Sequence, residues 1–211
     1  MSMHIDIVAV TYHQDETMKC FINSLKSQTN PNWSLYIIHD GEDDFFHEMK
    51  KDLEDNGYLN DKIVYDCKPR KADNPWGHES RDFGIEKYIQ STDDRFLIHT
   101  NVDNYFTPMM IEFIVETLED APQCNFMYWD CVHSHDNYFL DPPGKYGHLR
   151  SQLQECGIDM SCVAVKNSIA KANGFKYNSK NADWYYFSDI LQQIDVSNTV
   201  VKLNKILYVH N

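Results

Sequence analysis

The sequence RFLIHTNVDN at residues 95–104 joins an apolar run to a short polar segment. The apolar part is typical of a strand that is buried on both faces of a parallel sheet. The polar part supplies two asparagines and an aspartate, so side-chain oxygen atoms are concentrated where the strand ends. We therefore expect a buried strand at residues 95–100 that delivers Asn101, Asp103 and Asn104 to one edge of a sheet.

Three further strands are predicted before this one, and helices separate them. Residues 4–12 read HIDIVAVTY, which is β-branched and nearly continuously apolar, and shorter apolar runs follow at residues 34–39 and 63–67. Helices are predicted in the intervening stretches, at residues 15–28, 44–54 and 78–90. Alternating strands and helices predict a mostly parallel, Rossmann-like sheet whose ligand crevice lies at the carboxyl ends of the strands, where Tyr12 and Asp40 also fall.

The second half of the chain is less regular. The predicted elements are a helix at 108–119, a strand at 125–132, a mobile loop at 134–152, a strand at 159–165, a helix that Gly174 ends and a final amphipathic helix from residue 182. We expect the loop to shape the site for a second substrate. No internal repeat or linker interrupts the sequence, so we predict a single domain over residues 1–211.

Composition restricts the classes of ligand. The chain has 211 residues and a net charge of −13, which opposes binding to nucleic acid or to an anionic membrane. A phosphorylated ligand would need local positive charge from a divalent cation or from a few arginines and lysines. The first residues lack the features of a signal peptide, no run of about 18 to 20 apolar residues is present, and the six cysteines form no CxxC pair. We expect reduced thiols, no transmembrane segment and a cytoplasmic protein.

The NVDN segment has two interpretations. Mg²⁺ and Mn²⁺ prefer carboxylate and amide oxygens together with the oxygens of a diphosphate, which makes Asp103 a candidate metal ligand. A turn and helix cap rich in Asn and Asp would have the same composition, and spacing alone favours that interpretation.

Six segments in order resemble the family 2 glycosyltransferases with the GT-A fold. They are IDIVAVTYHQDE (5–16), IIHDGEDD (37–44), NPWGHESRDFGIEKYI (74–89), RFLIHTNVDN (95–104), GIDMSCVAVKNSIAKANGF (157–175) and ADWYYFSDI (182–190). The resemblance covers nearly the whole chain. It implies an α/β fold of the GT-A type, with a donor-binding half at about residues 1–104 and an acceptor-binding half at about residues 105–211.

The resemblance also implies roles for individual residues on the donor side. Thr11 and Tyr12 would flank the donor base, and Asp40 would accept a hydrogen bond from N3–H of the base, which favours uracil. Arg81 would lie near the base or the diphosphate. Asn101, Val102 and Asp103 occupy the position of the metal-binding DxD motif, and Asp103 would hold Mn²⁺ or Mg²⁺. Three basic residues could assist: Lys68, Arg70 and Lys71.

The chain departs from the family pattern at two acidic positions. Asn101 replaces the first aspartate of DxD, which implies weaker metal affinity. Ala182 replaces the glutamate before the catalytic aspartate, so Asp183 is the candidate general base and Asp189 the second choice. Without the resemblance, Asp183 reads as an acid that complements a helix dipole. His210 matches a distal metal ligand of many relatives, although a histidine so near the C-terminus is otherwise usually just exposed.

Two other groups of residues are interpreted as structural and not as functional. The segment from His133 to Asp136 has no matching Cys or His pair at zinc-site spacing, so we expect an exposed polar loop. The aromatic residues are assigned mostly to the core, with stacking of Trp129 or Trp184 on a sugar as the alternative. They are Trp76, Tyr128, Trp129, Trp184, Tyr185 and Tyr186.

The sequence thus predicts an inverting glycosyltransferase that moves a hexose from a UDP-sugar to a hydroxyl-bearing acceptor with the help of a divalent cation. The alternative is a non-catalytic nucleotide- or glycan-binding module of the same fold, which Asn101 and Ala182 favour. A nucleotidyltransferase is disfavoured because TYHQDE, at residues 11–16, lacks the Gly-rich phosphate loop of that class.

Overall fold

The structure is a computed structural model that describes residues 3–69, 76–134, 140–141, 146–176, 179 and 181–211. Its elements in chain order are β1 (His4–Thr11), α1 (Asp15–Lys26), β2 (Trp33–Asp40), α2 (Asp44–Asp55), β3 (Ile63–Lys68), α3 (His78–Tyr88), β4 (Arg95–Asn101), β5 (Tyr105–Phe106), α4 (Met110–Asp120), β6 (Phe126–His133), β7 (Leu140–Asp141), β8 (Gly147–Leu149), the 3-10 helix η1 (Met160–Cys162), β9 (Val163–Lys166), α5 (Asn167–Asn173), α6 (Ala182–Leu191), α7 (Val196–Thr199) and β10 (Val200–Val209).

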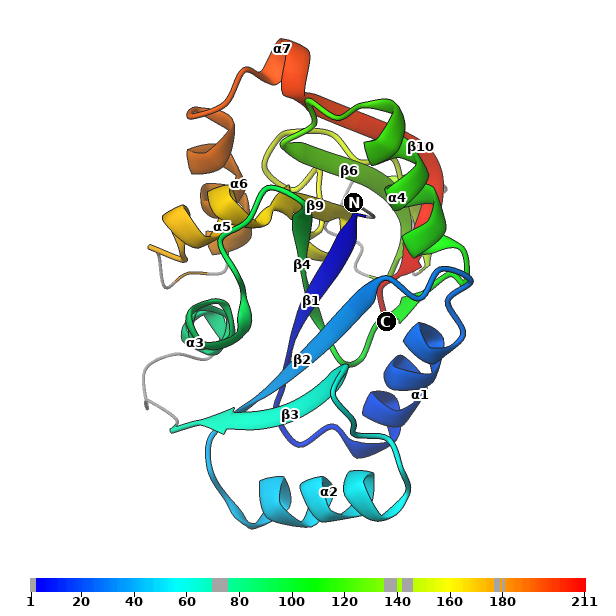
Figure 1. The fold of residues 1–211 in the computed structure, drawn as a ribbon, viewed down its shortest axis with the longest axis vertical. Coiled ribbons are helices and arrows are strands. Elements are labelled where there is room, and N and C mark those ends of the chain that lie inside the picture. The colour runs from blue at the N-terminus through cyan, green and yellow to red at the C-terminus, as the bar shows by residue number, and fades with distance from the viewer. Residues whose placement is uncertain (1–2, 70–75, 135–139, 142–145, 177–178, 180) are drawn as a thin grey trace.

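One sheet runs through the described part of the molecule, in the order β3-β2-β1-β4-β9-β6-β10-β5 (Figure 1). Its first four strands are parallel, as the alternation of strands and helices predicts. β9 then pairs antiparallel with both β4 and β6, while β6 and β10 are again parallel. The predicted α/β fold class is confirmed, with a sheet that is parallel in its first half and mixed in its second.

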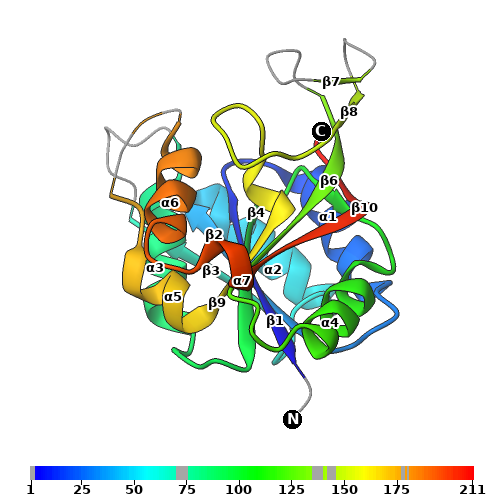
Figure 2. The same ribbon diagram turned by 90° about the horizontal axis from the view of Figure 1, so that it is seen from above.

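Helices cover both faces of the sheet (Figure 2). α3, α5 and α6 lie on one face, and α1, α2 and α4 lie on the other. β1 is buried from Ile5 to Thr11 and lies between β2 and β4, so it occupies the centre of the parallel half. A strand covered on both sides must be apolar on both faces, which is why residues 4–12 lack the alternation of a half-exposed strand.

One charged residue interrupts the apolar pattern of β1. Asp6 is fully buried, and Arg95 at the start of β4 donates to it from Nε over 2.8 Å. Asn167 at the start of α5 donates to the same carboxylate over 2.7 Å. A buried carboxylate without such partners would be strongly destabilising. The contacts of Asp6 with Arg95 and Asn167 therefore connect β1, β4 and α5 at the end of the sheet opposite to the carboxyl ends of β1 and β4.

The structure differs from the sequence-based expectation in two segments. The strand predicted at 159–165 begins as the 3-10 helix η1, because the Asp159 carboxylate accepts a hydrogen bond from the Ser161 N–H over 2.8 Å and caps that turn. The loop predicted at 134–152 contains β7 and β8, and β8 pairs antiparallel with β6. The rest of that loop, at 135–139 and 142–145, lies outside the described residues.

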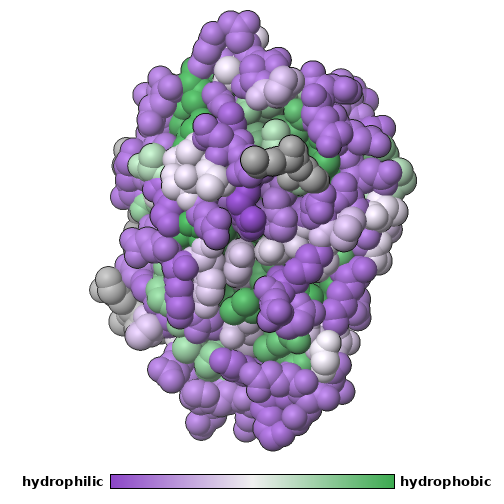
Figure 3. Space-filling view, viewed as in Figure 1, coloured by the Kyte–Doolittle hydropathy of each residue, from purple (hydrophilic) through white to green (hydrophobic). Residues whose placement is uncertain are grey.

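The surface and the cysteines agree with the composition. The face drawn in Figure 3 is mostly hydrophilic, and its hydrophobic residues form small separate areas. Among the described residues, no helix combines the length and the apolar character that a bilayer crossing requires. All six cysteines are free thiols, as expected.

Candidate functional site

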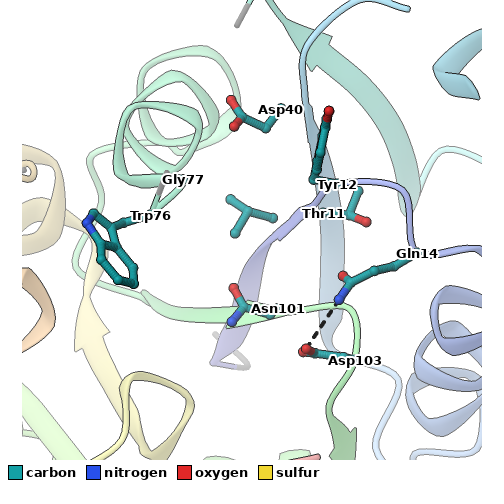
Figure 4. A pocket seen from close by; sticks show the side chains of 9 residues that line it. Thr11, Tyr12, Gln14, Asp40, Trp76, Gly77, Asn101 and Asp103 are labelled. Carbon is teal, nitrogen blue, oxygen red and sulfur yellow. Dashed lines mark hydrogen bonds between the residues drawn. The ribbon is translucent and has the colours of Figure 1, made fainter. Parts of the chain in front are cut away.

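A pocket of about 270 Å³ opens where β1, β2 and β4 end, and we call it the strand-end pocket (Figure 4). Its lining residues are Val10, Thr11, Tyr12, Gln14, Asp40, Trp76, Gly77, Asn101 and Asp103. The carboxyl ends of parallel strands meet at one edge of a sheet, so residues about thirty and sixty positions apart face one another here. Figure 4 shows Trp76 on the side of the pocket opposite Gln14.

The strand-end pocket collects most of the residues predicted for the donor site. Thr11, Tyr12, Asp40, Asn101 and Asp103 all line it. The Thr11 hydroxyl is buried without a hydrogen-bond partner among the described residues, so it is available to a ligand. The Tyr12 ring is 43% exposed and stacks on the ring of His13 with centroids 4.1 Å apart.

Val102 differs from its neighbours, because its side chain is fully buried in the core and does not line the strand-end pocket. Its backbone N–H donates to the carbonyl of Val10 over 3.3 Å, which fixes the chain where β4 ends. The alternation of side chains along a strand puts Asn101 and Asp103 on the pocket side and Val102 on the core side.

Gly77 forms the part of the strand-end pocket where α3 begins. Its φ of +70° lies in the left-handed region that glycine adopts without strain. A Cβ at this position would lie 3.3 Å from Val10 Cγ2 and 3.4 Å from Arg81 Nη1. The glycine therefore lets the start of α3 approach β1 and brings Arg81 against the end of the sheet.

Arg81 is the buried cation of the site. Its guanidinium donates from Nη1 to the backbone carbonyl of Trp76 over 2.8 Å and from Nη2 to Oδ1 of Asn101 over 2.7 Å. Burial lowers the pKa of Arg81, whereas the negative charges of Asp183, Asp159 and Asp103 raise it. A guanidinium stays protonated in proteins, so Arg81 supplies the positive charge that the acidic composition requires.

A second pocket of about 210 Å³, which we call the carboxylate pocket, adjoins the first. Its lining residues are Trp76, Arg81, Thr100, Asn101, Asn104, Asp159, Met160, Ser161, Asp183, Tyr208 and His210. Trp76 and Asn101 line both pockets, so a ligand that fills the strand-end pocket can reach the carboxylates of the second one.

Asp183 lies in the first turn of α6 and faces the carboxylate pocket. Burial raises the pKa of its carboxyl group to about 6; Arg81 opposes this shift and Asp159 adds to it. A group with this pKa is mostly ionised at neutral pH and still accepts a proton readily. Asp189 lies outside the pocket, in an ion pair with Lys176 at 2.7 Å.

His210 lies in a cluster with His133 and Asp159. One side-chain nitrogen or oxygen atom from each of the three lies within 4.8 Å of the others, and the two imidazole rings stack at 4.2 Å. Burial by itself raises the pKa of Asp159, but His133, His210 and the Ser161 N–H together lower it to about 2. The parallel pairing of β6 with β10 places His133 beside His210.

Asp103 lies in the strand-end pocket, and Gln14 donates to its Oδ2 over 3.3 Å (Figure 4). The carboxylate of Asp103 is a hard oxygen donor of the kind that Mg²⁺ and Mn²⁺ prefer, whereas the amide oxygen of Asn101 accepts from Arg81. Asp103 is therefore chemically suited to the predicted divalent cation. A shared role for Asp103 and His210 in holding one cation stays a prediction, because the two line different pockets.

Several residues of the site carry no signal in the sequence, and others lie elsewhere than the sequence predicts. Trp76 is 46% exposed at the junction of the pockets, so its assignment to the core was wrong. Tyr185 is also exposed, and Trp129 is fully buried in the core, away from any sugar. Lys68, one of the basic residues that could assist on the donor side, forms an ion pair with Glu79 at 2.6 Å. Four residues named above lie outside the described residues: Arg70, Lys71, His135 and Asp136.

The remaining missed residues are Gln14, Ser80, Asp159 and His133. Ser80 is buried in α3 and donates to Oδ1 of Asp40 over 3.1 Å, which orients that carboxylate at the pocket. A helical serine carries no signal for such a contact. Asp159 lies in one of the segments that resemble the family, in a stretch whose sequence predicts a strand.

No family model and no curated protein matches the sequence. Solved structures of glycosyltransferases match the fold. S. aureus TarS matches with a TM-score of 0.73 at 12% identity, over 99% of this chain and 37% of that chain. TarS 1–349 in complex with UDP-GlcNAc matches with a TM-score of 0.71 at 11% identity, over 98% and 58%.

The mannosyltransferase PcManGT from Pyrobaculum calidifontis, in complex with GDP-Man and Mn²⁺, matches with a TM-score of 0.69 at 11% identity, over 100% of this chain and 57% of that chain. The chain thus spans between about a third and three fifths of the length of these solved proteins. At such low identity the similarity establishes a GT-A-like glycosyltransferase fold.

The raised pKa of Asp183 predicts that Asp183→Asn stabilises the protein at pH 7. The carboxyl has an ordinary pKa of 3.8 and a folded-state pKa of about 6, so the folded state binds more protons than the unfolded state between these values. Its contribution to stability therefore falls as pH rises through this window. The variant should gain about 1–3 kcal/mol in free energy of unfolding at pH 7 and nothing near pH 4, as measured by urea denaturation.

Asp189→Asn is the matched control, since it removes a carboxylate from the surface of the same helix and should change stability by less than about 1 kcal/mol at either pH. An Asp183→Asn variant no more stable than the wild type at pH 7 would show that Asp183 is not held in an unfavourable ionised state.

Proposed function

We propose that the protein is an inverting glycosyltransferase of family 2 that transfers a hexose from a UDP-sugar to a hydroxyl-bearing acceptor. The observation that supports this most is the junction of the two pockets. The strand-end pocket has the residues suited to a nucleotide diphosphate, and the carboxylate pocket places Asp183 beyond it, past Trp76 and Asn101. The structural neighbours support a transferase, since TarS is solved with UDP-GlcNAc and PcManGT with GDP-Man.

The base of the donor would bind between Tyr12 and Asp40. Ser80 donates to Oδ1 of the Asp40 carboxylate over 3.1 Å and orients it at the strand-end pocket, where the carboxylate would accept N3–H of uracil. Uracil and guanine carry a ring N–H that a carboxylate can accept, whereas adenine and cytosine have a bare ring nitrogen at that position, so Asp40 favours uracil over adenine and cytosine. The Thr11 hydroxyl is placed to contact the same nucleotide.

The diphosphate would lie near Asp103 and Arg81. Mn²⁺ or Mg²⁺ held by Asp103 would stabilise the negative charge of the departing diphosphate. Arg81 adds fixed positive charge next to Asn101, whose amide oxygen accepts a hydrogen bond from the guanidinium. An aspartate at position 101 would pair with Arg81 and cancel part of that charge, so the asparagine leaves more of it for the phosphates.

Asp183 would accept the proton of the acceptor hydroxyl as that oxygen attacks the anomeric carbon. Its carboxylate is held in the first turn of α6 and faces the carboxylate pocket. The exposed indole of Trp76 offers an apolar face on which a sugar ring can stack at the junction of the two pockets. Ala182 is 1% exposed, so a glutamate there would have to be buried, and the single carboxylate of Asp183 serves as the base.

The alternative is a binding module of the same fold that holds the nucleotide without transfer. Two neutral residues at usually acidic positions, Asn101 and Ala182, favour it. The pKa of Asp183 favours catalysis, because a carboxyl raised to about 6 matches a general base better than a structural surface acid.

Donor turnover tests the assigned role of Asp103. The purified protein should release UDP from at least one of UDP-glucose, UDP-galactose and UDP-GlcNAc in the presence of Mn²⁺, and EDTA should abolish the release. Asp103→Asn should reduce it by about 10² or more, as EDTA does, since it removes the charge of the proposed metal ligand.

Asp120→Asn, at an exposed acid at the end of α4, is the control and should leave turnover unchanged. Metal-independent turnover would contradict the role of Asp103. Calorimetry that shows tight UDP binding with no release from any donor would favour the binding module.

The pKa of Asp183 predicts the pH dependence of transfer. The rate should rise as pH increases through about 6, because only the ionised carboxylate can accept a proton. Asp183→Asn should bind UDP like the wild type but lose transfer by about 10²- to 10⁴-fold, and its residual rate should not follow that pH profile. Asp189→Asn should keep both rate and profile, and a fully active Asp183→Asn variant would remove Asp183 from the mechanism.

A further inference from the structure

Two imidazoles and a carboxylate come together outside both pockets, at His13, His39 and Asp43. One nitrogen of each ring and one carboxylate oxygen all lie within 4.8 Å of one another. His13 follows β1, His39 is in β2 and Asp43 caps α2. The end of β2 and the turns that follow β1 and β2 therefore meet at this cluster, and their residues Tyr12 and Asp40 line the strand-end pocket.

The hydrogen bond of His39 fixes which of its nitrogens carries the proton. Nδ1 lies 2.6 Å from the carbonyl oxygen of Gly41, and a carbonyl can only accept, so Nδ1 is protonated. Nε2 must then hold a lone pair. It is buried in a residue with no exposed surface, and it has no hydrogen-bond partner among the described residues.

A histidine that donates from one nitrogen to a backbone carbonyl and keeps the other as a bare lone pair is oriented as metal-bound histidines usually are. A buried nitrogen left without a hydrogen-bond partner otherwise destabilises the folded state. A bound cation would satisfy Nε2 of His39, and no described hydrogen bond does so.

The other two groups lie at the surface side of the cluster. His13 Nε2 is 2.8 Å from Oδ2 of Asp43, while Oδ1 of Asp43 accepts the N–H of Phe46 and is held in place by it. His13 has a φ of +51°, a conformation that non-glycine residues seldom adopt, and its ring centroid lies 5.9 Å from that of His39. A proton on Nε2 of His13 would leave, or move to Nδ1, when a cation binds.

We propose that His13, His39 and Asp43 form a zinc site with a fourth position open to water. Two imidazoles and one carboxylate are a donor set that proteins use for Zn²⁺, whereas Mg²⁺ and Mn²⁺ favour oxygen ligands such as those around Asp103. Tetrahedral zinc places its ligand atoms about 3.4 Å apart, so small shifts of the exposed His13 ring would close the cluster. The net charge of −13 favours a cation here as well.

Zinc at this position would cross-link the two turns that form one wall of the strand-end pocket. Tyr12 stacks on His13 at 4.1 Å with an angle of 16° between the rings, so fixing His13 also fixes Tyr12. The zinc site does not depend on the proposed transferase function, because its ligands are separate from Asp103 and Asp183.

Metal binding by the full chain tests this site directly. After removal of metal with EDTA and dialysis, Zn²⁺ is titrated in competition with a chromophoric chelator, and Co²⁺ is titrated in parallel to record its visible ligand-field absorption. The comparison is between the wild type, His13→Ala, the control His47→Ala and His210→Ala. His47 is an exposed histidine of α2, and the His210 variant removes a ligand of the other histidine cluster.

The wild type should bind Zn²⁺ at this cluster and show a tetrahedral Co²⁺ spectrum. His13→Ala should lose one equivalent of Zn²⁺, or weaken its binding by about 100-fold or more, and lose that spectrum, while His47→Ala should keep both and His210→Ala should keep the equivalent that depends on His13. Zn²⁺ should raise the Tm of the wild type and of His47→Ala but not of His13→Ala.

The proposal is overturned if the wild type binds no Zn²⁺, if His13→Ala binds it with the same stoichiometry and affinity as the wild type, or if His210→Ala alone abolishes binding. None of these readouts uses sugar transfer, so a failed zinc site and a failed transferase assignment are distinguishable.

Discussion

The central constraint on this site is the charge balance around a buried arginine. Arg81 donates hydrogen bonds to the carbonyl of Trp76 and to Asn101. The negative charges of three aspartates, Asp103, Asp159 and Asp183, act on its guanidinium. Without Arg81 these carboxylates would repel one another in a partly desolvated space. The single positive charge of Arg81 allows the three carboxylates to remain ionised, but it does not neutralise all three. A divalent cation at Asp103 would add the positive charge that an anionic diphosphate needs, and so acidic a protein could then bind such a ligand.

Prediction from the sequence succeeds where the information is local. The apolar runs at residues 4–12 and 95–100 identify β1 and β4, and the polar residues that follow them line the predicted pocket, because parallel strands end at one edge. It failed where contacts depend on pairing between distant segments. His133 and His210 meet only because β6 and β10 pair in parallel with Val132 beside Val209, and nothing in either segment specifies that register. Trp76 lies in a loop whose sequence has no periodic pattern, so the sequence does not indicate that its side chain is exposed.

The two departures from the family pattern have different physical consequences. Asn101 still contacts the guanidinium of Arg81 through a neutral oxygen, so the contact survives and one negative charge is removed. Ala182 is buried, as are Tyr186 and Phe187 of the same helix, which leaves Asp183 as the acid of that turn that lines the carboxylate pocket. The histidine cluster at His13 is a chemically separate feature: its nitrogen donors and the oxygen donor of Asp103 would select different cations.

The claim that a cation at Asp103 allows the protein to bind a diphosphate is tested most directly by a crystal structure of the full chain with UDP and Mn²⁺. An anomalous-difference map should show manganese within about 2.5 Å of an Asp103 carboxylate oxygen and of oxygens from both phosphates. UDP bound in the strand-end pocket with the Asp103 carboxylate turned away, and with no manganese between it and the diphosphate, would contradict the account.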